Sequence, residues 1–171
     1  MAQAERPALD EFDLKILQRV QEDNLMPQRE ISEAIGLSAP AVARRLKRLR
    51  ATGVIRKDMA IVDERALGRP LTIVVEVTTE NERLDLIDDM KRRFSACPQV
   101  QQCCYVTGET DFILIMNVRD MDEYTALTRL LFFEGGNVKS FRTCVTMEKV
   151  KANGPVPVEA SSSRAGEVST T

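Results

Sequence analysis

The chain has 171 residues, 43% of them hydrophobic, and a formal net charge of −2 at pH 7. This length allows one ordinary domain or two small ones, and the apolar share is too high for a disordered chain. The near-neutral charge excludes a chain-wide basic excess, so any nucleic-acid site must be a local patch. There is no apolar signal segment at the start, and no apolar run approaches the roughly 20 residues of a membrane span. We therefore expect a soluble, cytoplasmic protein without a membrane partner.

The first part of the chain predicts two helices that end at recognisable stops. Apolar residues recur at every fourth position up to about Glu22, which predicts a helix with one buried side. Asp10 can cap the start of this helix. A short second helix begins at Pro27 and ends at Gly36, which suit a first helical position and a C-terminal cap.

A third helix begins after Ser38, which can cap it, and stops at Gly53. Its cap lies only two residues after Gly36, where the second helix ends. Two helices joined by so tight a turn indicate a helix-turn-helix, whose second helix enters the DNA major groove. A four-residue apolar repeat forms the buried stripe of this helix: Val42, Leu46 and Leu49.

The outward side of the third helix carries the DNA-binding candidates. Small residues near its start allow close approach to base edges, and arginine can grip guanine O6 and N7 with two hydrogen bonds. The alternative is a solvated basic face on a structural helix, but the tight turn and the small residues favour DNA. The DNA hypothesis requires that the arginines point away from the protein's interior. The predicted DNA-binding residues are Ser38, Ala39, Ala41, Arg44, Arg45, Lys47 and Arg48, with Arg50, Arg56 and Lys57 near the DNA backbone.

From Leu71 the apolar pattern takes the period of strands, and the predicted order is β-α-β-β-α-β, the ferredoxin-like arrangement of an α+β protein. We expect Leu84 and Met121 to face inward from the two helices. The expected elements are strands at 71–79, 99–107, 112–119 and 138–150, helices at 82–94 and from 120 to about 134, and a possible short strand at 59–62. The expected domains are a helix-turn-helix domain at 1–62, a linker at 63–70, the βαββαβ domain at 71–150 and a disordered tail at 151–171.

Apolar residues occupy both faces of the expected sheet. Phe112, Leu114 and Met116 point to one face, whereas Ile113 and Ile115 point to the other. A four-stranded sheet with helices on one side would leave its second apolar face in water. The same face of another subunit is the simplest cover, so the sequence predicts a homodimer.

The turn between the expected strands at 99–107 and 112–119 is the second candidate site. Gly108 can take a positive φ and expose backbone N–H groups to an anion. Glu109 and Asp111 could accept hydrogen bonds from an ammonium group. Together these groups suit a zwitterionic amino acid, although an ordinary hairpin turn explains the same residues.

Patterns for catalysis and metal binding are missing from the sequence. There is no histidine, hence no Ser–His or Cys–His pair, and there is no phosphate-binding P-loop. The cysteines lack zinc-ligand spacing and are expected to be buried reduced thiols, with redox sensing as the alternative. We expect no enzyme activity, no metal and no cofactor. The cysteines are Cys97, Cys103, Cys104 and Cys144.

Four stretches together resemble the Lrp/AsnC family, the leucine-responsive and asparagine-responsive transcription regulators. They are Leu14–Ile16, Gly36–Ile55, Val106–Phe112 and Thr143–Val150, and the resemblance covers nearly everything from Leu9 to Val150. The resemblance implies an N-terminal winged-helix-type helix-turn-helix domain and a C-terminal ferredoxin-like ligand-binding domain that pairs through its sheet.

The resemblance also implies a homodimer that assembles further, often into a disc of four dimers, and a small amino-acid effector bound between dimers. The segment 132–137 is longer and more glycine-rich than the family's usual turn at this place. The effector-binding residues that the resemblance and the turn together indicate are Thr107, Gly108, Glu109, Thr110 and Asp111.

Our first functional hypothesis is a sequence-specific regulator of transcription on double-stranded DNA, whose assembly or DNA affinity is modulated by a small amino acid. The alternative is an architectural, nucleoid-type protein that organises DNA with little sequence preference. The ratio of specific to random-DNA affinity at fixed salt separates the two. An enzyme built on the ferredoxin-like half is disfavoured by the missing motifs.

Overall fold

The computed structural model describes residues 8–134 and 136–158. These residues divide into two compact units, one built from the chain up to Ala60 together with the segment from Lys151, the other from Ile61 to Val150. Each unit has its own cluster of buried apolar side chains. Within the described residues, no helix is both long and apolar enough to cross a membrane.

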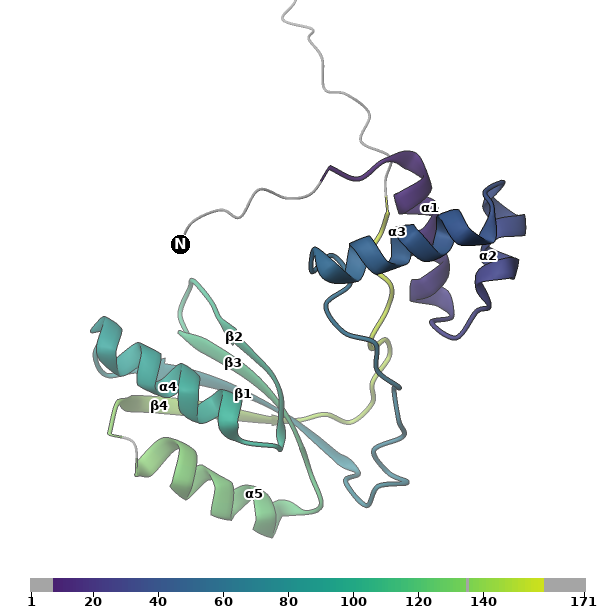
Figure 1. The fold of residues 1–171 in the computed structure, drawn as a ribbon. Helices are drawn as coiled ribbons and strands as arrows, with labels where there is room; N and C mark the ends of the chain where they lie inside the picture. The colour runs from purple at the N-terminus through teal and green to yellow at the C-terminus, as the bar shows by residue number, and fades with distance from the viewer. Residues whose placement is uncertain (1–7, 135, 159–171) are drawn as a thin grey trace, which may run out of the picture. The chain divides into compact units, whose positions relative to one another are not determined.

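Three helices form the first unit (Figure 1): α1 (Glu11–Glu22), α2 (Gln28–Ile35) and α3 (Ala39–Ala51). Asp10 caps α1 by accepting from the N–H of Asp13, and the Asp13 carboxylate accepts from the N–H of Asp10 in return. Gly36 ends α2 at a φ of 73°, a left-handed conformation that glycine adopts without strain. Because this stop is sharp, α3 begins three residues later, as the sequence predicts.

The possible short strand at 59–62 is not present. The chain from Gly53 to Val62 has no helix or strand, and Met59, Ile61 and Val62 are exposed. A strand needs a neighbour to take its backbone hydrogen bonds, and none lies beside this segment.

The second unit is a four-stranded antiparallel sheet with strand order β2-β3-β1-β4. In the middle of the sheet Val74 lies opposite Ile115 on one side and Cys144 on the other. The predicted βαββαβ order is confirmed. Its elements are β1 (Leu71–Thr79), α4 (Leu84–Ala96), β2 (Val100–Tyr105), β3 (Phe112–Val118), α5 (Met121–Thr128), the π-helix η1 (Arg129–Phe133) and β4 (Val138–Val145).

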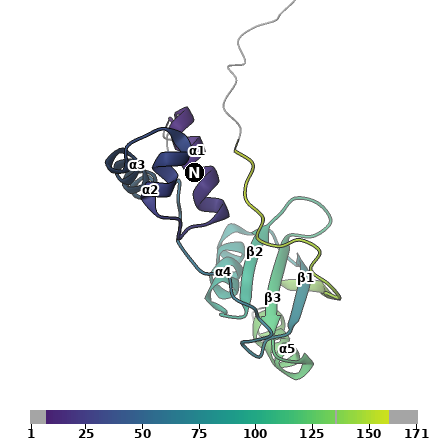
Figure 2. The ribbon, with the colours of Figure 1, turned by 90° about the vertical axis from the view of Figure 1, so that its right-hand side faces the viewer.

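Both helices of this unit pack on one face of the sheet (Figures 1 and 2). Phe94 of α4 and Tyr124 of α5 join a single buried cluster with Val75 and Leu114 of the central strands. The expected inward direction of Leu84 and Met121 is wrong, since Leu84 is 79% exposed and Met121 is exposed too. Each is the first residue of its helix, where fewer neighbours cover a side chain.

The helix expected from 120 to about 134 does not run unbroken. It ends at Thr128 and continues as a π turn, in which the N–H of Glu134 donates to the carbonyl of Arg129 at 3.0 Å. The wider turn places Phe132 in the core against Phe94 and Phe141 and leaves Phe133 exposed. This π turn overlaps the start of the 132–137 segment that departs from the family pattern.

Neither α4 nor α5 lies over the other face of the sheet. Val74, Ile113 and Ile115 point to this open face and are half-buried, in agreement with the strand alternation that the sequence predicts. The last strand ends at Val145 rather than at 150. The N–H of Thr146 still donates to the carbonyl of Thr72 in β1 at 2.9 Å, and residues 146–150 belong to no helix or strand.

The cysteines alternate in the same way along β2. Cys103 packs against the core, whereas Cys104 is exposed on the open face, and Cys144 of β4 is exposed as well. The expectation of four buried thiols is therefore wrong for two of them, while Cys97 is buried. Burial raises the pKa of the Cys103 thiol.

The segment after the second unit also differs from expectation. Residues 151–158 were expected to belong to a disordered tail, but Val156 makes two hydrogen bonds with the side chain of Gln21 in α1. Its N–H donates to Gln21 Oε1 at 2.7 Å, and its carbonyl accepts from Gln21 Nε2 at 3.1 Å. A glutamine amide can thus replace a neighbouring strand as a backbone partner. Residues 159–171 of the expected tail lie outside the described residues.

Candidate functional site

The candidate DNA-reading helix α3 is held by its cap and by its buried stripe. The Ser38 hydroxyl accepts from the N–H of Ala41 at 3.4 Å. Ser38 is exposed at the start of the helix. Val42, Leu46 and Leu49 are buried among residues of α1 and α2, as predicted. The opposite side of α3 is therefore free to meet another molecule.

Two of the predicted cations are fully available on this outward side. Arg44 and Lys47 are exposed and make no ion pair with any other residue in the described part of the chain. Arg50, near the helix end, is instead paired with Asp58 at 2.8 Å. The side of α3 that carries Arg44 and Lys47 thus presents unneutralised positive charge, which attracts phosphate groups.

Two further arginines of α3 bind the protein's own carboxylates. Arg45 Nη1 lies 2.6 Å from Asp10 Oδ2 and 2.8 Å from Asp13 Oδ1, and Arg48 Nη2 also donates to Asp13. The expectation that these arginines all point away from the interior holds for Arg44 but not for Arg45, whose side chain is only 22% exposed. Arg48 remains exposed although it is paired, with 47% of its side chain accessible.

Asp13 has no exposed surface, so its charge depends on these contacts. Burial alone would raise the pKa of Asp13, but hydrogen bonds from Arg48, from the Asp10 N–H and from Arg45 hold that pKa below its ordinary value. The same pairs lower the pKa of Asp10 and raise that of Arg45. In the sequence, Asp13 has only the mark of a capping box, and its partners on α3 lie 32 and 35 residues away.

The second candidate site begins at the hairpin between β2 and β3. Gly108 has a φ of 137°, the positive value expected for it. Thr110 Oγ1 donates to the carbonyl of Val77 at 2.8 Å, and the Asp111 carboxylate accepts from the N–H and hydroxyl of Thr79 at 2.7 and 2.9 Å. Thr110 and Asp111 thus anchor the hairpin to β1.

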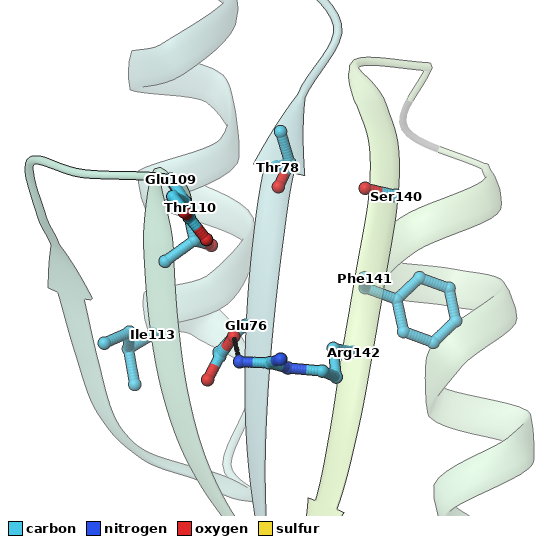
Figure 3. A pocket seen from close by; sticks show the side chains of 8 residues that line it. All are labelled: Glu76, Thr78, Glu109, Thr110, Ile113, Ser140, Phe141 and Arg142. Atoms are coloured by element: carbon cyan, nitrogen blue, oxygen red, sulfur yellow. Dashed lines mark hydrogen bonds and ion pairs between the residues drawn. The ribbon is translucent and has the colours of Figure 1, made fainter.

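An open pocket of about 380 Å³ lies beside this hairpin, on the face of the sheet that no helix covers (Figure 3). At its floor Arg142 of β4 donates to Glu76 of β1 at 2.5 Å. Both signs of charge therefore meet in one hollow. The lining residues are Glu76, Thr78, Glu109, Thr110, Ile113, Ser140, Phe141 and Arg142.

The pocket contains some of the predicted effector residues and adds others. Glu109 and Thr110 line it, whereas Thr107, Gly108 and Asp111 are not among its lining residues. Glu76 and Arg142 are missing from the prediction because they meet only through the pairing of β1 with β4. The one local signal was a single carboxylate in a strand with no other charged residue.

Two known protein domains match separate parts of the chain. Residues 9–56 match the winged helix-turn-helix DNA-binding domain, and residues 72–156 match the Lrp/AsnC ligand binding domain. An HTH-type transcriptional regulator of Sinorhizobium fredii is 44% identical over 88% of this chain and 89% of its own length. The leucine-responsive regulatory protein of Haemophilus influenzae is 32% identical over 88% of this chain and 91% of its own length.

A solved structure has the same fold. It is the complex of a transcriptional regulator from Neisseria meningitidis with L-Met, with a TM-score of 0.78 and 27% identity over 88% of this chain and 97% of that one. The matched domains, the relatives and the fold lead to one conclusion: the chain belongs to the Lrp/AsnC family of transcriptional regulators.

Proposed function

We propose that this regulator reads a specific DNA site with α3 and that a small amino acid controls its assembly or its DNA affinity. The observation that carries the DNA part is the exposed positive side of α3, opposite its buried stripe and directly after the tight turn at Gly36. A helix presented in this way fits the major groove. A regulator of transcription acts where the chromosome is, and we therefore infer a cytoplasmic location.

The DNA-binding candidates on α3 and its cap divide into two groups in this proposal. Ser38, Ala39 and Ala41 bring the start of the helix close to the DNA, while Arg44 and Lys47 meet phosphates or base edges. Among the paired arginines, the half-exposed Arg48 can still reach a base, and Arg45 serves mainly to hold α3 against α1.

The pocket supports an amino acid as effector because its charges match both ends of one. Glu76 and Glu109 can accept hydrogen bonds from an α-ammonium group, and Arg142 can bind an α-carboxylate with its planar fork. The related regulator from Neisseria meningitidis was solved with L-Met, which supports the same ligand class.

We infer that a second copy of the chain covers the open face of the sheet, and that dimers assemble further, up to an octamer of four dimers. The support is the half-buried row of Val74, Ile113 and Ile115, which a single chain leaves in water. The pocket lies on this same face, so a bound amino acid can favour one assembly over another.

A thermal-unfolding screen of the twenty amino acids tests the effector. At about 100 times its dissociation constant, a true ligand adds about 2.7 kcal/mol of stability. Arg142→Gln should abolish the response, while Arg83→Gln, which removes an exposed ion pair with Asp85 on α4, should keep it. A flat response to all twenty, or an unchanged one in Arg142→Gln, would refute the proposed ligand site.

Fluorescence anisotropy tests the sequence specificity. The protein should bind the duplex that it enriches from a random library about a thousandfold or more tightly than a scrambled duplex at equal salt. Equal affinity for the two duplexes would favour an architectural role instead.

A further inference from the structure

A four-residue ionic cluster joins the first helix to the DNA-reading helix. Asp10 and Asp13 come from the start of α1. Arg45 and Arg48 lie three residues apart, on successive turns of α3. The Arg45 guanidinium lies over the ring of Phe12, with its central carbon 5.6 Å from the centre of the ring. Asp13 is the centre of the cluster, because it alone contacts both arginines and the capping N–H of Asp10.

Asp13 fixes the position of the Arg48 guanidinium through a hydrogen bond. One nitrogen of the Arg48 guanidinium donates to the buried carboxylate, while nearly half of the side chain remains exposed. A guanidinium has five N–H donors, so this contact leaves donors free for another acceptor. An arginine that is already held loses less conformational freedom when it grips a base, which favours the bidentate contact with guanine.

Asp13 also sets how much charge α3 presents. The two carboxylates match the two arginines of the cluster, so that Arg44 and Lys47 remain the unneutralised cations in the middle of α3 among the described residues. Attraction to phosphates is the same for every DNA sequence, since it depends on the number of cations that displace counterions. By neutralising Arg45 and Arg48, the two carboxylates weaken binding to every DNA sequence alike. Base contacts then remain the source of sequence preference.

We propose that Asp13 is a positioning residue for DNA recognition, which fixes Arg48 for base contact and limits the sequence-independent charge of α3. This inference rests on the proposed role of α3 in reading DNA. Its consequence is that Asp13, although buried and unable to touch DNA, raises the preference of the protein for its own site over other sequences.

The test compares the full chain with Asp13→Asn, which keeps the shape of the side chain and removes its charge. Anisotropy titrations with the enriched duplex and with a scrambled duplex are made between about 50 and 200 mM KCl. The variant should show a steeper dependence of affinity on salt for scrambled DNA, by about one in log–log slope. Its ratio of specific to scrambled affinity should fall by about fivefold or more, the lower end of what one arginine–guanine contact contributes.

Two further variants separate this role from a structural one. Glu22→Gln removes a carboxylate from the other end of α1, where it pairs with Arg19, and should leave the ratio unchanged. Arg48→Lys keeps the charge but lacks the planar fork, so it should lower the ratio without changing the slope, and it remains informative if Asp13→Asn does not fold.

An unchanged ratio in either folded variant, or an equal fall in Glu22→Gln, overturns the role of Asp13. A wild-type chain with no preference between the duplexes would instead contradict the proposed function. In that case the salt slope of Asp13→Asn still decides whether Asp13 limits the charge of α3.

Discussion

Glu123, in the first turn of α5, joins three separate parts of the second unit. Its Oε2 accepts from the backbone N–H of Arg119 at 2.8 Å, and its Oε1 accepts from Gln99 at 2.9 Å and from Arg69 at 3.1 Å. Arg69 belongs to the segment just before β1, so the carboxylate also fixes where the chain enters the sheet. The hydrogen bonds from the N–H of Arg119, from Gln99 and from Arg69 lower the pKa of Glu123 from 4.5 to about 2. Burial alone would raise this pKa, but the hydrogen bonds have the larger effect.

This difference in pKa sets the expected cost of Glu123→Gln. A fall from 4.5 to about 2 corresponds to about 3 kcal/mol in favour of the charged form. The Arg69 side chain is 38% exposed, so solvent screens part of this interaction and we expect a loss of about 2 kcal/mol near neutral pH. Because the pKa is lower in the folded state, the stabilisation is present above about pH 4.5 and is lost as the pH falls towards about 2.

Urea unfolding followed by circular dichroism measures this effect in the wild type and in Glu123→Gln. The difference in free energy of unfolding should be about 2 kcal/mol at about pH 7 and should shrink to well under 1 kcal/mol at about pH 2.5. Asp122→Asn, one residue earlier and exposed, should change stability by no more than about 0.5 kcal/mol. A cost for Glu123→Gln that is the same at both pH values would refute the argument from its charge.

Three further substitutions test the helix cap, the DNA surface and the core. Ser38→Ala should lower the free energy of unfolding by about 1 kcal/mol through loss of the α3 cap, and no loss would show that the cap does not stabilise the helix. Lys47→Gln should weaken binding to all duplexes alike and reduce the salt slope by about one, whereas a change confined to one sequence would indicate a base contact. Leu114→Ala should cost about 2–5 kcal/mol in urea unfolding, since this side chain is fully buried between β3 and the helices, and a smaller cost would mean that the core collapses around the gap.

Elements with strong local signals could be predicted almost to the residue. The helix after Asp10, the helix between Ser38 and Gly53, and the strand at Leu71–Thr79 all have the expected bounds. Their ends are decided by neighbours in the sequence: a capping side chain accepts from an N–H three residues on, and Gly36 takes the left-handed conformation that stops α2. The alternation of Ile113 with Leu114 likewise determines which face of the sheet each one meets.

Contacts between distant segments lay beyond such signals. The strand expected at 59–62 has the right residues but no partner beside it, and the π turn that buries Phe132 depends on the aromatic rings of Phe94 and Phe141. The pocket takes Arg142 from one strand and Glu76 from another, 66 residues apart.

Local patterns along the chain were enough to predict most helices and strands, the basic character of α3 and the family to which the chain belongs. Which charges remain available could be read only from the folded chain, because that depends on which carboxylate comes within reach of which arginine. Arg44 and Arg45 are neighbours in sequence and identical in chemistry, yet one faces solvent and the other binds Asp10 and Asp13. Successive residues on a helix differ by about 100° in direction, and the packing of α1 against α3 makes that difference decisive.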